Sequence, residues 1–148
     1  MIMNILFSTI AAVSFGIMFN IRGANLIFAG LSGGLGFFFY SITTVYGYDS
    51  HIGMLVASIA MSICAEFLAR KRKTPAYVFL VPALIPVVPG GAIFQFALNL
   101  LEGNNELAFS YGIKTILEAG ALAIGIILVS SLTKVIIRML NKNKAHVM

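Results

Sequence analysis

Apolar residues occur along the chain in five long runs, which short polar or glycine-containing stretches separate. The runs cover about residues 2–19, 26–46, 52–69, 77–101 and 115–137. Each run is long enough to cross about 30 Å of hydrocarbon as a helix, because an α-helix rises about 1.5 Å per residue. The pattern therefore predicts an all-α polytopic membrane protein, with one transmembrane domain over residues 1–148 and five transmembrane helices.

The composition supports this class. Only 10% of the residues are charged and 59% are hydrophobic, whereas about a quarter of a soluble domain is charged. So few charges cannot cover the surface of a water-soluble globule. The net charge of +5 does not indicate nucleic-acid binding, because the basic residues gather at the ends of apolar runs. The single cysteine, Cys64, excludes an intrachain disulfide.

The distribution of charge predicts an orientation. With five spans, the loops after the first and third runs share one side of the membrane with the C-terminal tail. That side holds nine of the ten basic residues: Arg22, Arg70, Lys71, Arg72, Lys73, Lys134, Arg138, Lys142 and Lys144. The other side holds Asp49, Glu102 and Glu106, with Lys114 as its one basic residue. The positive-inside rule then places the N-terminus outside and the C-terminus in the cytoplasm, in a multi-pass protein of the cytoplasmic membrane.

The fourth run is interrupted by Pro86-Val87-Val88-Pro89-Gly90-Gly91. Proline removes a helical N–H and clashes with the preceding turn, so this sequence predicts a broken helix. Transporters use broken helices near the middle of the membrane as binding sites, where the N-terminus of the second half-helix faces an anionic group. A purely structural bend is the alternative. Gln95 and Asn99 follow at helical spacing and form a polar line on one face.

A few other polar residues are candidates for contact with a substrate. Glu118 follows Lys114 by four residues, which favours an ion pair or, alternatively, a proton carrier. Asn20 and Arg22 either cap the first span or contribute to the site. The complete set of candidate substrate-binding or gating residues is Pro86, Pro89, Gly90, Gly91, Gln95, Asn99, Glu118, Asn20 and Arg22. The sequence has no catalytic triad order, nucleotide fingerprint or metal-ligand spacing, so we expect no enzyme, no catalytic residue, no metal and no cofactor.

Glycine spacing suggests close helix packing. Gly30 and Gly34 lie in GxxxG register in the second run, and small residues at this spacing let helix backbones approach closely in lipid. The partner helix could belong to this chain or to another protein.

Two stretches resemble the threonine/serine exporter family. They are Phe19-Asn20-Ile21-Arg22-Gly23 and, more specifically, the segment from Pro82 to Gly90, with the glycine-rich second run between them. More narrowly, the chain is similar to the small-subunit half of that family, the kind implicated in succinate export. The resemblance implies a secondary exporter of small hydrophilic metabolites, either threonine and serine or a C4-dicarboxylate. It also implies a second, larger integral membrane subunit of the same family as partner, with the lipid bilayer as surroundings.

Two other functions fit the same residues. The chain could be an assembly or regulatory subunit that does not itself transport, since packing faces rich in glycine serve that role equally well. It could also be a homo-oligomeric channel. Five spans alone would make a small transporter, so several copies of the chain could assemble.

Overall fold

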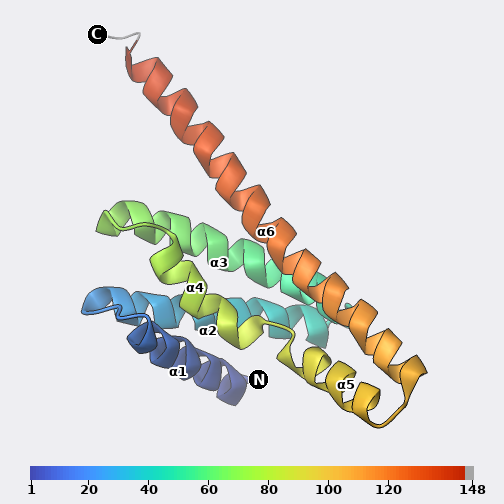
Figure 1. The fold of residues 1–148 in the computed structure, drawn as a ribbon. Coiled ribbons are helices and arrows are strands. Elements are labelled where there is room, and N and C mark those ends of the chain that lie inside the picture. Colours follow the sequence, from blue (N-terminus) through green and yellow to red (C-terminus); the bar gives the residue numbers. More distant parts are fainter. Residues whose placement is uncertain (146–148) are drawn as a thin grey trace.

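The computed structural model describes the backbone of residues 1–145 and the side chains of residues 1–139. Within this part of the chain the secondary structure is helical throughout, as predicted (Figure 1). The elements are α1 (Ile2–Met18), α2 (Ala24–Val45), α3 (Ser50–Arg72), α4 (Tyr77–Leu84), the short 3₁₀ helix η1 (Ile85–Val87), α5 (Gly90–Leu101) and α6 (Asn105–Ala145).

The hairpin of α1 and α2 is held together by close contacts at glycines. A Cβ atom added to Gly33 would lie 2.5 Å from the Cβ of Ala12, and one added to Gly30 would lie 2.4 Å from Val13. The Ser8 hydroxyl donates a hydrogen bond of 3.1 Å to the Gly33 carbonyl across the same interface. The GxxxG face of Gly30 and Gly34 therefore packs against α1 of this chain.

Helix α3 packs against α2 on one side and against α6 on the other, while α4 packs against α2 and α3. Two apolar clusters fill these contacts. The first joins Ala29, Ala65, Leu68 and Phe79, and the second joins Met54, Ala57, Met61, Ala83, Val87 and Leu122. Large apolar side chains elsewhere on the helices are exposed, which is the surface that a lipid environment favours.

The fourth apolar run is broken where its prolines predict. Helix α4 ends at Leu84, η1 follows, and Val88 adopts an extended ψ of 142° before α5 begins at Gly90 behind Pro89. The axis bends by 46° between the two parts. Prolines at positions 86 and 89 cannot donate backbone hydrogen bonds to the preceding turn, which explains why the helix stops here.

The last helix is longer than the apolar pattern predicts. Helix α6 begins at Asn105, well before Thr115, and continues for 41 residues to Ala145 (Figure 1). Its first turns carry the polar residues Glu106, Ser110 and Lys114, so hydropathy gives no sign of a helix there. They are helical because they pack against α5, and tertiary contact overrides a weak local pattern.

The lengths of the helices match a multi-pass membrane protein. Helices α2, α3 and α6 are each long and apolar enough to cross a bilayer, and the bent pair of α4–η1 and α5 passes the same test taken together. Helix α1 is apolar but has 17 residues, the lower limit for a span.

The basic residues of two loops lie at one end of the bundle. Arg72, at the end of α3, donates a hydrogen bond of 3.0 Å from Nε to Oδ1 of Asn25 at the start of α2. The Arg72 guanidinium also lies 5.6 Å from the ring centre of Phe28. The Arg22 loop and the cluster of residues 70–73 are therefore neighbours. The side chains of Lys142 and Lys144, which also entered the predicted orientation, lie outside the described residues.

Candidate functional site

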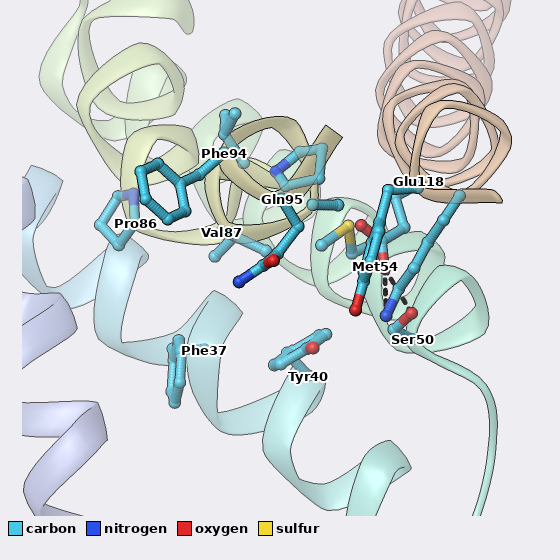
Figure 2. Close-up of a pocket in the computed structure, with 15 residues that line it drawn as sticks. Phe37, Tyr40, Ser50, Met54, Pro86, Val87, Phe94, Gln95 and Glu118 are labelled. Carbon is cyan, nitrogen blue, oxygen red and sulfur yellow. Dashed lines mark hydrogen bonds and ion pairs between the residues drawn. The ribbon is translucent and has the colours of Figure 1, made fainter. Parts of the chain in front are cut away.

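A cavity of about 480 Å³ lies beside the break between η1 and α5. Helices α2, α3 and α6 contribute its other lining residues (Figure 2). Its walls are largely apolar and aromatic, with a small number of polar groups, which is the usual composition of a small-molecule site. The lining residues are Phe37, Tyr40, Ser50, Met54, Pro86, Val87, Val88, Pro89, Gly91, Ala92, Phe94, Gln95, Tyr111, Lys114 and Glu118.

The most buried charge in the cavity wall is Glu118, which is 3% exposed. Its Oε1 atom accepts a hydrogen bond from the hydroxyl of Ser50 at the start of α3. The ammonium group of Lys114, one turn earlier on α6, lies 3.9 Å from the same oxygen. Figure 2 shows both interactions converging on the carboxylate. A carboxylate this buried needs such partners, because an unpaired charge in a membrane interior is strongly unfavourable.

Gln95 brings an uncharged polar group into the cavity from α5. Its side-chain amide points into the space that Phe37 and Tyr40 of α2 face from the other side (Figure 2). The amide offers both donors and an acceptor. Asn99, one turn further on, does not reach the cavity. It is buried, and its Nδ2 atom donates 2.7 Å to the Gln95 carbonyl, within its own helix.

The structure divides the predicted site residues into two groups. Pro86, Pro89, Gly91, Gln95 and Glu118 line the cavity together, although they come from two separate helical segments and the break. The others lie outside its lining: Gly90, Asn99, Asn20 and Arg22.

Asn20 and Arg22 contact each other, not the cavity. Arg22 Nε donates 3.0 Å to Asn20 Oδ1 at an exposed position, and Asn20 has a positive φ of 57°. They form the turn between α1 and α2, at the basic end of the bundle. The expectation that Asn20 and Arg22 share a site with the break is therefore not supported, whereas their role in ending the first helix agrees with the geometry.

Tyr40, Ser50 and Met54 line the cavity from α2 and α3 but are not among the predicted site residues. Nothing in their local sequence marks them, because only the packing of three helices brings them to the break. Lys114 could have been singled out from the sequence, because it is the one basic residue on the predicted outer side of the membrane.

A second, smaller cavity of about 380 Å³ adjoins the first. Ser50 and Lys114 line both cavities, and Asp49, His51 and Ser110 line only the second. Lys114 therefore contacts both spaces, and its side chain is 51% exposed.

Taken together, the first cavity offers a cation, a buried carboxylate, an amide and a broken helix within an apolar frame. This arrangement suits reversible binding of a small polar molecule.

The family of the chain follows from comparison with known proteins. No solved structure matches the chain. The model of the family described as Threonine/Serine exporter, ThrE, matches residues 4–132, which include every residue that lines the cavity and the whole break. The chain therefore belongs to the threonine/serine exporter ThrE family and is a multi-pass membrane protein of the exporter type.

Proposed function

We propose that this chain is the small subunit of a two-component secondary exporter in the cytoplasmic membrane. The observation that carries the proposal is the cavity at the broken helix, where Gln95, Lys114 and Glu118 meet. A cavity with a few polar groups at the interruption of a membrane helix is the arrangement that secondary transporters use for small hydrophilic cargo.

The proposed topology has five spans, with the N-terminus outside and the C-terminus in the cytoplasm. The contact between Arg72 and Asn25 supports it, because the two basic loops then lie on one side, as the positive-inside rule requires. Helix α1 and the bent pair of α4–η1 and α5 each count as one span in this arrangement.

The second component is a larger integral membrane subunit of the same family. An odd number of spans supports this part of the proposal. If the partner contributes a matching half of five spans, the two halves cross the membrane in opposite directions, which is the geometry of many alternating-access transporters.

The cargo is a small hydrophilic metabolite, either threonine and serine or a C4-dicarboxylate such as succinate. The cavity is large enough for either class, at about 480 Å³. Lys114 offers a cation for a carboxylate, and the Glu118 carboxylate and the Gln95 amide offer polar partners for the rest of the molecule.

The test is export from vesicles that contain this chain with and without a candidate larger membrane subunit of the same family. Labelled threonine, serine and succinate serve as cargoes. We expect efflux of at least one cargo only when both proteins are present, and loss of that efflux in the Gln95→Leu variant. Efflux from the chain alone would indicate a homo-oligomeric channel. Full efflux with Gln95→Leu would make this chain an assembly subunit.

A further inference from the structure

The ion pair in the cavity consists of two groups with very different freedom. The Glu118 side chain is 4% exposed and is held by the Ser50 hydroxyl from α3. The Lys114 side chain is 51% exposed and has a long flexible stem. Its ammonium group lies 3.9 Å from Glu118 Oε1, at the outer limit of an ion pair. Glu118 is therefore the fixed member of the pair and Lys114 the movable one.

Few other titratable groups surround Glu118. Tyr40 of α2 and Tyr111 of α6 line the same cavity, α3 contributes only the Ser50 hydroxyl, and α5 contributes only the neutral Gln95. Asp49 and His51 lie in the adjoining cavity, which Lys114 also lines. Among the described residues that line the main cavity, Lys114 is thus the only cation near the buried carboxylate.

We propose that Lys114 and a proton compete for Glu118, and that this competition couples proton binding to the binding of a carboxylate. The inference rests on the proposed export function and assigns its cavity a coupling mechanism. When Glu118 is ionised, it holds Lys114. When Glu118 takes up a proton, the pair is broken and the Lys114 ammonium is released to bind a carboxylate of the cargo.

Electrostatics require the protonation of Glu118 and the binding of a carboxylate to Lys114 to occur together. A carboxylate that took Lys114 from an ionised Glu118 would leave a buried anion without its cation, which is unfavourable at low dielectric. Protonation removes that charge, so the carboxylate enters with one proton. Over the pH range in which Glu118 of the empty protein is ionised, linkage predicts that affinity falls up to about tenfold per unit of rising pH.

A zwitterionic cargo follows a different rule. The ammonium group of threonine can pair with Glu118 while its carboxylate pairs with Lys114, so no proton is needed. The number of protons taken up thus depends on whether the cargo brings its own cation.

The test counts protons by titration calorimetry in buffers of different ionisation enthalpy. The full chain, reconstituted in lipid with its second subunit, is titrated with succinate and with threonine at a pH where both are fully ionised. We expect roughly one proton taken up per bound succinate and roughly none per bound threonine. In Glu118→Gln, succinate should bind without proton uptake and without pH dependence. In Lys114→Gln, succinate affinity should fall at least about tenfold, as expected for the loss of a charge-assisted hydrogen bond.

Glu66→Gln is the matched control. Glu66 also pairs with an arginine four residues later, at 3.4 Å from Arg70, but lies outside the cavity lining. Its loss should leave the proton count at the wild-type value. Proton uptake that is unchanged in Glu118→Gln, or equal for succinate and threonine, would overturn the coupling while leaving export intact. If neither probe binds, the proposed function fails and the coupling fails with it.

Discussion

The hydroxyl of Ser50, the first residue of α3, donates a hydrogen bond to the carboxylate of Glu118 on α6. The two residues are 68 positions apart in the sequence. The bond fixes a buried charge at the wall of the cavity and joins two helices at the same point.

Replacement of Ser50 by alanine should destabilise the protein by about 1.5–3 kcal/mol, the usual contribution of a hydrogen bond to a charged group. Thermal unfolding in detergent measures the change. Ser14→Ala serves as control, because the exposed Ser14 hydroxyl bonds only to the Ile10 carbonyl of its own helix. Ser50→Thr keeps a hydroxyl and should retain most of the stability that Ser50→Ala loses. Equal effects of Ser50→Ala and Ser14→Ala would show that the bond to Glu118 contributes nothing.

Two adjacent glycines test the role of the cavity. Gly91 lines it and Gly90 does not, yet a Cβ atom added at either position meets nothing within 4 Å. Gly91→Leu should therefore fill part of the cavity and reduce export by about tenfold or more, the factor that corresponds to 1.4 kcal/mol. Gly90→Leu should retain most of the activity, with both variants inserted in the membrane at wild-type levels. Vesicle efflux decides between them, and equal loss in both would point to flexibility of the break as the requirement.

The contact between α3 and α6 depends on Gly125. A Cβ atom there would lie 1.9 Å from Ser58 Oγ and 3.0 Å from the backbone carbonyl oxygen of Leu55. Gly125→Ala should lower the free energy of unfolding by about 1–3 kcal/mol, the usual effect of overpacking. Gly120→Ala on the same helix meets nothing within 4 Å, so it should be neutral or raise stability by up to about 1 kcal/mol through helix propensity. Melting temperatures that fall equally in both variants would contradict this packing.

The proposed orientation can be checked by accessibility labelling. Single cysteines introduced as Tyr48→Cys and Lys71→Cys, in a Cys64→Ser background, should react with a membrane-impermeant maleimide from opposite sides. Tyr48 should be labelled in intact cells, and Lys71 only after the membrane is permeabilised. Labelling of both positions from the same side would exclude a single crossing by α3 and with it the five-span topology.

Local chemistry explains which parts of the fold could be predicted. The break at Pro86 and Pro89 follows directly from the missing N–H of proline, and the ion pair of Lys114 and Glu118 follows from helical spacing. The cavity itself could not be predicted, because Tyr40 and Ser50 reach it only through the packing of α2 and α3. Asn99 shows the same limit. Its spacing from Gln95 correctly gives the helix face, but the hydrogen bond to the Gln95 carbonyl satisfies its side chain away from the cavity.

The position of the cavity along the helices has a consequence for how cargo would reach it. Ser50 lies about 33 Å along α3 from Arg72, and Val87 lies about 15 Å along α4 and η1 from Tyr77, at about 1.5 Å per residue. The cavity therefore occupies the half of the bundle remote from the basic loops. In the other half of the bundle the space between the helices is filled by the packed side chains of Ala29, Ala65, Leu68 and Phe79. Phe79 has no exposed surface. On the basic side of the cavity these packed side chains lie between α2, α3 and α4, so a route for cargo through this part of the chain would require α4 to move away from α2 and α3.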